Sequence, residues 1–148
     1  MPEKTVALAA DHAGFALKSH LVDWLIGRGV VARDLGTDSA EAVDYPDFAE
    51  ALVDVLRSGA AECGVLICGS GIGMSIAANR HCGIRAALAS DAESARLARL
   101  HNDANVLVLP GRRISETEAE RCMEAFLTAT FEGGRHRRRL GKIAGGVA

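Results

Sequence analysis

Short apolar runs and longer amphipathic segments alternate along this chain of 148 residues. Five runs are short and mainly apolar, as buried parallel strands are, and they cover residues 5–10, 30–35, 64–68, 85–89 and 106–109. The segments between and after them carry apolar residues at helical spacing: residues 15–28, 45–56, 72–79, 91–100 and 115–130. Strands that alternate with helices predict a mostly parallel sheet with helices on both faces.

Turn and cap residues mark several boundaries of these segments. Pro46 stands in the first turn of the second helical segment, and Ser115 with Glu118 resembles a capping box at the start of the last one. Gly133-Gly134 then breaks the pattern before a basic tail. Without an internal repeat or a linker, these elements predict one domain over residues 1–148, with the basic tail at about 133–148. We expect a Rossmann-like three-layer α/β/α sandwich with a five-stranded parallel sheet.

Composition excludes several classes of protein. The chain is 49% hydrophobic and 24% charged, as globular proteins are. A net charge of −2 argues against general nucleic-acid binding, and no apolar run is long enough to span a bilayer. The start of the chain has no signal-peptide pattern, and the four cysteines form no C-x-x-C pair. We therefore expect a cytoplasmic protein with reduced thiols.

The segment from Cys68 to Ser75 is the strongest candidate for chemistry. It passes from a strand through three glycines, Gly69, Gly71 and Gly73, into a helix. Such a turn leaves N–H groups free at a helix N-terminus, which suits an anion. The helix dipole and these donors also favour the thiolate of Cys68. We expect the other three cysteines, Cys63, Cys82 and Cys122, to be small buried hydrophobes.

Other polar residues follow predicted strands, and each has a plain structural alternative. Asp11-His12 follows the first strand, where Asp11 could merely cap the next helix. Arg112 follows the last strand. His101-Asn102 follows a helix, where a histidine often only interacts with the C-terminal carbonyls. Tyr45, the one tyrosine, could be a packing residue. Ligands of parallel α/β sheets bind at the carboxyl ends of strands, where the chain has Asp11-His12, Cys68-Gly69, Ser90-Asp91 and, nearly, Gly111-Arg112.

The basic tail contains the run Arg135-His136-Arg137-Arg138-Arg139. It could be a solvated charge run or a nucleic-acid arm. If it is helical, Arg135 and Arg139 share one face and form a fork for a phosphate dianion, which Arg112 could join. Arg137 and Arg138 would then face solvent.

A dinucleotide site is the main alternative for the glycines. The turn reads G-x-G-x-G rather than G-x-G-x-x-G, and it follows the third strand rather than the first. Asp91 lies near the distance expected of a ribose-binding acid, but the chain has no room for a separate substrate domain. A smaller phosphate ester therefore fits the pattern better.

Taken together, these segments resemble the type B ribose-5-phosphate isomerase family, which includes galactose-6-phosphate isomerase subunits. The matching blocks cover nearly the whole chain and include residues 11–14, 44–46, 68–73, 77–79, 83–85, 101–106 and 132–136. The resemblance implies interconversion of ribose 5-phosphate and ribulose 5-phosphate through an enediolate, without a metal or other cofactor.

The resemblance also implies residue roles. Cys68 would move the proton between C2 and C1, the amides from Gly69 to Ser75 would stabilise the enediolate, and the Ser70 hydroxyl could assist. His101 would open the sugar ring, with Asp11 as a partner. Phosphate ligands and sugar contacts would complete the set: His12, Arg112, Arg135, Arg139 and nearby His136 for phosphate, and Tyr45, Asn102 and the loop residues Gly69, Gly71, Ile72, Gly73, Met74 and Ser75 around the sugar.

Some relatives place a glutamate in the glycine loop, where this chain has Met74, so Cys68 is the one base available in the loop. Galactose-6-phosphate isomerase subunits resemble the chain less, because they tend to lack the blocks at 101–103 and 132–136. Six-carbon phosphates such as allose 6-phosphate or galactose 6-phosphate remain open, as does a non-enzymatic nucleotide-binding domain. The family implies a homodimer or homotetramer with active sites shared across the dimer.

Overall fold

The computed structural model describes residues 4–144 and contains one sheet of parallel strands. In spatial order the strands are β2 (Val31–Asp34), β1 (Thr5–Ala10), β3 (Cys63–Cys68), β5 (Val106–Pro110) and β4 (Ala86–Leu88). The predicted five-stranded parallel α/β/α sandwich is therefore confirmed.

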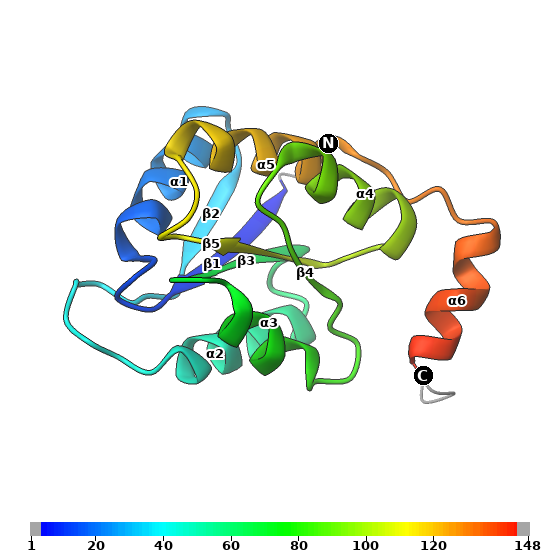
Figure 1. Cartoon of the computed structure of the whole chain (residues 1–148), viewed down its shortest axis with the longest axis horizontal. Coiled ribbons are helices and arrows are strands. Elements are labelled where there is room, and N and C mark those ends of the chain that lie inside the picture. Colours follow the sequence, from blue (N-terminus) through cyan, green and yellow to red (C-terminus); the bar gives the residue numbers. More distant parts are fainter. Residues whose placement is uncertain (1–3, 145–148) are drawn as a thin grey trace.

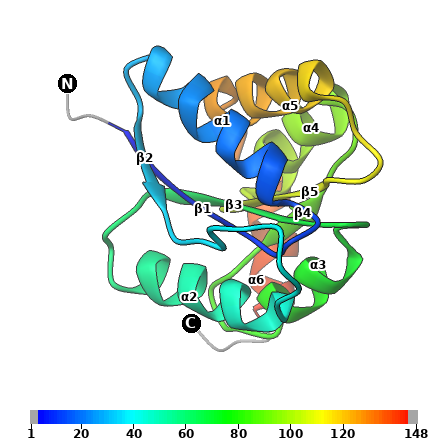
Figure 2. The ribbon, with the colours of Figure 1, turned by 90° about the vertical axis from the view of Figure 1, so that its left-hand side faces the viewer.

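Helices cover the two faces of the sheet unequally (Figures 1 and 2). One face carries α1 (Phe15–Gly27), α4 (Ala92–Asn102) and α5 (Glu116–Thr128), and the other carries α2 (Tyr45–Arg57) and α3 (Ile72–Asn79). Two apolar clusters fill the spaces between the layers. No helix within residues 4–144 is long and apolar enough to cross a membrane.

The register of the central strands brings three strand ends together. Ala10 pairs with Ile67, and Cys68 pairs with Pro110. The segments that follow β1, β3 and β5 therefore begin side by side at the carboxyl edge. From β1 the chain continues to β2 at one edge of the sheet, whereas β5 and β4 lie beyond β3 toward the other edge. The strand order therefore reverses between β1 and β3. Ligands of such sheets bind at this kind of switch point.

The boundaries of α1 to α5 lie within two residues of the sequence prediction. α4 continues to Asn102 instead of ending near Leu100, and Asp103 closes it with a positive φ of 44°. His101 and Asn102 therefore belong to the last helical turn rather than to a following loop. At the start of α5, the Ser115 side chain accepts from the Glu118 N–H as predicted. The Glu118 carboxylate, however, accepts from the Ala92 N–H, so the capping box is only half formed.

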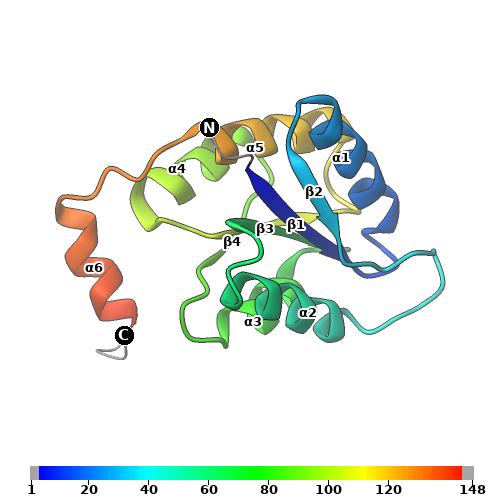
Figure 3. The ribbon, with the colours of Figure 1, turned by 180° about the vertical axis from the view of Figure 1, so that it is seen from behind.

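Within the predicted basic tail, Arg135–Ile143 form the helix α6, and residues 145–148 of the tail lie outside the described residues. The helix follows Gly133 and Gly134, whose φ values of 71° and 54° suit residues without a Cβ. Figures 1 and 3 show α6 standing off beside the end of α4, away from both helical layers. The charged faces of α6 are therefore not used in packing the sheet.

Candidate active site

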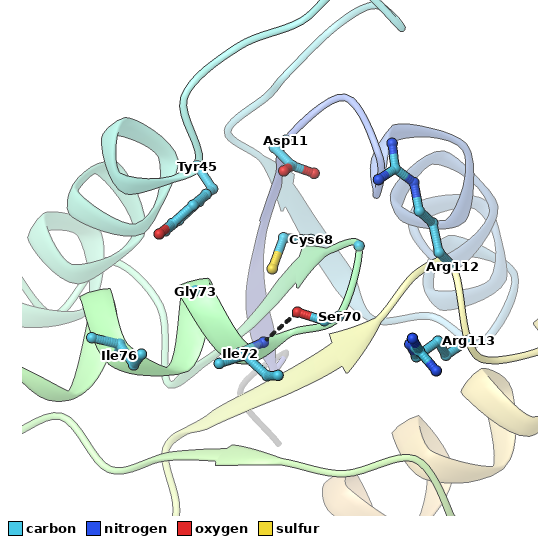
Figure 4. Close-up of a pocket in the computed structure, with 10 residues that line it drawn as sticks. Asp11, Tyr45, Cys68, Ser70, Ile72, Gly73, Ile76, Arg112 and Arg113 are labelled. Atoms are coloured by element: carbon cyan, nitrogen blue, oxygen red, sulfur yellow. Dashed lines mark hydrogen bonds between the residues drawn. The ribbon is translucent and has the colours of Figure 1, made fainter.

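A hollow of about 730 Å³ lies at the carboxyl edge of the sheet (Figure 4). Its lining combines residues after β1, β3 and β5 with the starts of α2 and α3: Asp11, Tyr45, Cys68, Gly69, Ser70, Ile72, Gly73, Ile76, Arg112 and Arg113. Eight of these ten were predicted from the sequence, while Ile76 and Arg113 were not. Ile76 lies one helical turn after Ile72 and Arg113 follows Arg112, so helical spacing and chain adjacency were signals for both.

Cys68 occupies the centre of this hollow (Figure 4). It is the last residue of β3, and its carbonyl accepts from the Gly111 N–H at 2.8 Å, which fixes the strand end against the segment after β5. The residue is 4% exposed, and the Asp11 carboxylate and the Ser70 hydroxyl lie on either side of the thiol. A largely desolvated thiol therefore faces the space where a ligand would sit.

The glycine turn requires Gly71. Its φ is 78°, and a Cβ there would lie 2.4 Å from Leu88 Cδ1. Two of the expected donors are already used. Ser70 Oγ accepts from the Ile72 N–H at 3.2 Å, and the Ser75 N–H and hydroxyl both donate to the Gly71 carbonyl.

Gly73 and Met74 hold the other first-turn N–H groups of α3, which have no acceptor within the helix. The Met74 side chain is fully buried in the core, so only its backbone can reach a ligand. Of the expected run of amides from Gly69 to Ser75, the N–H groups of Ile72 and Ser75 are therefore already used within the turn.

Two side chains lie close over glycine backbones of the turn. A Cβ on Gly73 would lie 2.5 Å from Tyr45 Cζ, and one on Gly69 would lie 3.3 Å from Arg112 Cδ. Glycine at both positions lets a ring and a guanidinium approach the turn. Tyr45 and Arg112 therefore form two walls of the hollow.

Asp11 and His12 shape the segments next to the hollow. Asp11 Oδ1 accepts from the N–H groups of Ala13 and Gly14, at 3.0 and 3.1 Å, so it does cap the turn before α1. His12 Nδ1 accepts from the Val43 N–H at 3.1 Å and holds the loop before α2. A neutral His12 ring with this acceptor carries its proton on Nε2. His12 does not itself line the hollow.

A second group of predicted residues lies elsewhere, on α4 and α6. The rings of His101 and His136 stack with centroids 4.4 Å apart. Arg135 and Arg139 are exposed on α6, as are Arg137 and Arg138. Asn102 lines a separate hollow together with Leu140 of α6. Desolvation and, next, the positive charge of nearby Arg135 lower the pKa of His136.

The two groups lie at opposite edges of the sheet. Arg99 and Asp103, which flank His101, line a hollow with Cys63 at the start of β3. Cys68 ends the same strand, and five steps of about 3.3 Å separate its two ends by about 17 Å. The structure therefore does not bring His101, Asn102, Arg135, His136 and Arg139 to the Cys68 hollow within one chain.

The remaining thiols divide into two kinds. Burial raises the pKa of Cys63 to about 11 and that of Cys122 to about 12, so neither is a thiolate at neutral pH. The prediction that all three are buried is confirmed for Cys122, whereas Cys63 is only partly buried and Cys82 is exposed in the turn after α3. That turn is held by backbone bonds among residues 78–84 and leaves the side chain outside the core.

Comparison with known proteins identifies the family. Residues 6–143 match the family described as Ribose/Galactose Isomerase. The chain belongs to the ribose/galactose isomerase family. Ribose-5-phosphate isomerase B of Escherichia coli is 44% identical over 140 residues, covering 95% of this chain and 94% of that protein.

Solved structures of ribose/galactose isomerase family members superpose closely. A ribose 5-phosphate isomerase from Thermotoga maritima has a TM-score of 0.96 at 50% identity, covering 97% of this chain and 99% of that one. Ribose-5-phosphate isomerase B from Mycoplasma genitalium, described with bound ribulose-5-phosphate, has a TM-score of 0.93 at 39% identity, with 99% and 98% covered.

Proposed function

We propose that this chain interconverts ribose 5-phosphate and ribulose 5-phosphate. The E. coli relative, which this chain matches over 94% of its length, is named ribose-5-phosphate isomerase B. The Mycoplasma genitalium relative is described with bound ribulose-5-phosphate, the ketose of this reaction. The observation that carries the proposal is the Cys68 thiol, which faces a hollow beside the free N–H groups of an α3 turn. A base next to preorganised N–H donors is the arrangement that an enediolate requires.

Each group in the hollow then has one task. Cys68 takes the proton from C2 and returns it to C1. The Gly73 and Met74 N–H groups stabilise the oxyanion that develops between them. Ser70, whose Oγ accepts from Ile72, still has its own hydroxyl proton to donate to the sugar. Tyr45 bounds the sugar, and Asp11 handles protons of the sugar oxygens.

Ring opening and phosphate binding require the second group of residues. Ribose 5-phosphate is mainly cyclic, and His101 is the histidine assigned to open it. Arg135, Arg139 and His136 bind the phosphate together with Arg112 and His12. Because the second group lies at the other edge of its own sheet, we propose that a second copy of the chain supplies it.

An exposed apolar surface next to the hollow supports this dimer. Ile72 and Ile76 of α3 and Leu88 of the edge strand β4 are all exposed. The two isoleucines also line the hollow, so a copy that covers them lies against the site. α6 stands off the body and carries exposed Ile143, as a helix that reaches a neighbour would. We also propose a cytoplasmic location, which the four free cysteines support.

The test is an isomerase assay of the purified protein with ribose 5-phosphate, allose 6-phosphate and galactose 6-phosphate. Cys68→Ala should lower turnover of ribose 5-phosphate by about 10²–10⁴, the usual contribution of a general base. Cys82→Ala, at the exposed thiol, should leave it unchanged. Preference for a six-carbon substrate would contradict the assigned substrate, and full turnover by Cys68→Ala would contradict the assigned base.

A further inference from the structure

Three potential metal ligands meet where α4 and α6 approach each other. His101 comes from the last turn of α4, Glu132 from the segment before α6, and His136 from the first turn of α6. One ligand atom from each lies within 4.8 Å of the others. The Glu132 N–H donates to the Leu100 carbonyl at 3.0 Å, which anchors this residue beside the end of α4.

Hydrogen bonds do not account for this cluster. His101 Nε2 lies 3.7 Å from Glu132 Oε1, and His136 Nε2 lies 3.8 Å from Glu132 Oε2, both beyond hydrogen-bond distance. His136 is only 5% exposed, and its Nε2 is buried without a hydrogen-bond partner among the described residues. A buried polar atom of this kind costs free energy unless something binds it.

The donor set fits a borderline divalent transition ion. Two imidazole nitrogens and one carboxylate are ligands typical of zinc, with bonds of about 2.0–2.2 Å and a fourth position for water. Tetrahedral ligands at that bond length lie about 3.4 Å apart. The distances of 3.7 and 3.8 Å involve different oxygens of Glu132, so the carboxylate must turn to place one oxygen near both rings. The two rings are stacked with an interplanar angle of 16°, so one imidazole must turn until its nitrogen lone pair points at the ion that the other ring holds.

We propose that His101, Glu132 and His136 form a site for Zn²⁺ or a similar ion, such as Co²⁺ or Ni²⁺, that clamps α6 to α4. The site is not required for isomerisation. It acts as an inhibitory site, because an ion bound to His101 removes the lone pair that ring opening uses. Binding of the ion stands independently of the proposed function, and only its inhibitory consequence rests on that function.

A second histidine offers a matched control. The two nitrogens of His20 lie 2.6 Å from Glu116 and 2.7 Å from Glu120, so both already have partners. This cluster has one imidazole, and it lies on α1 and α5, away from α6. His20→Gln therefore removes a histidine from a carboxylate-rich surface without touching the proposed site.

The experiment is calorimetric titration of chelator-treated protein with Zn²⁺, in a Cys82→Ser background that removes the exposed thiol. One ion should bind per chain, and its addition should raise the melting temperature. Glu132→Gln should weaken binding at least tenfold, and His136→Gln should abolish it, whereas His20→Gln should bind as the parent does. Glu132 is exposed, so its variant tests the site even if His136→Gln fails to fold.

Two outcomes would overturn the proposal. Equal Zn²⁺ affinity of the parent and Glu132→Gln would mean that the ion binds elsewhere. Inhibition that persists in Glu132→Gln would place the inhibitory ion on another group, such as the Cys68 thiol. If the protein binds Zn²⁺ as expected but isomerises no sugar phosphate, the proposed function fails while the site stands.

Discussion

Two inactive variants should restore activity when they assemble together. Cys68→Ala removes the proposed base, and His101→Asn removes the group assigned to ring opening. Within one chain Cys68 ends β3, whereas the residues that flank His101 lie beside Cys63 at the start of that strand, about 17 Å away. One chain therefore does not place both side chains on one sugar. A working site would take Cys68 from one copy and His101 from the other.

The expected activity follows from two-fold symmetry. Random pairing of equal amounts makes about half of all dimers mixed. In a mixed dimer, one site lacks both groups and the other lacks neither. The mixture should therefore show about a quarter of wild-type activity, and isolated mixed dimers about half. Each parent should retain about 1% or less, because loss of a general acid or base costs about 10²–10⁴.

The assay uses co-expression of the two variants with different affinity tags, two-step purification of the mixed dimer, and continuous measurement of ribulose 5-phosphate formation. The matched control pairs Cys68→Ala with Arg112→Ala. Arg112 lines the same hollow as Cys68, so that mixed dimer has no intact site and should gain nothing.

The reasoning is refuted if the purified mixed dimer is no more active than its parents. It is also refuted if the Arg112 control gains as much as the test pair, since the gain would then not report on shared sites.

Three further predictions concern the surface, the walls and the phosphate fork of the site. Ile76→Asp should convert the protein to monomers in analytical ultracentrifugation, because Ile76 is 61% exposed in the single chain and burying an isoleucine contributes about 1.5–3 kcal/mol; a variant that stays dimeric would place the interface elsewhere. Gly73→Ala should raise KM, because the added Cβ would lie 2.5 Å from Tyr45 Cζ and displace that ring. The melting temperature should change little, because alanine stabilises a helix by about 1 kcal/mol relative to glycine and offsets this contact. An unchanged KM would exclude Tyr45 as a sugar contact. Arg139→Ala should lower kcat/KM about tenfold to a hundredfold, since a hydrogen bond to a charged group contributes about 1.5–3 kcal/mol, whereas Arg138→Ala should change it little and mainly at low salt; equal losses that disappear with added salt would indicate only diffuse attraction.

Local sequence patterns were enough to predict the layers and one half of the site. The apolar runs predicted all five strands, because each is buried along most of its length or pairs directly with one that is. Helical spacing predicted the covering helices, and glycines marked the turn after Cys68. Since parallel strands end at a common edge, the sequence also predicted that residues after the strands lie together. Asp11, Cys68 and Arg112 do line one hollow, whereas His12 and Ser90-Asp91, which the same argument covered, do not line it.

Side-chain direction around the glycine turn depended on packing. Met74 and Ile76 are both apolar residues of the same short helix, yet Met74 is buried in the core and Ile76 faces the hollow. Ser75 lies in the predicted donor run, but its N–H and hydroxyl both bond to Gly71. These outcomes follow from how α3 is rotated against the sheet, which no local pattern specifies.

The sequence by itself determined which residues are proposed to carry chemistry and which of them follow strands. Only the tertiary structure decided that these residues form two groups, and that His101, Glu132 and His136 meet in one of them. The physical reason is the geometry of a parallel sheet, in which the covering helices run opposite to the strands. Residues at the carboxyl ends of strands, such as Cys68, and residues at the carboxyl ends of helices, such as His101, therefore lie at opposite edges of the sheet.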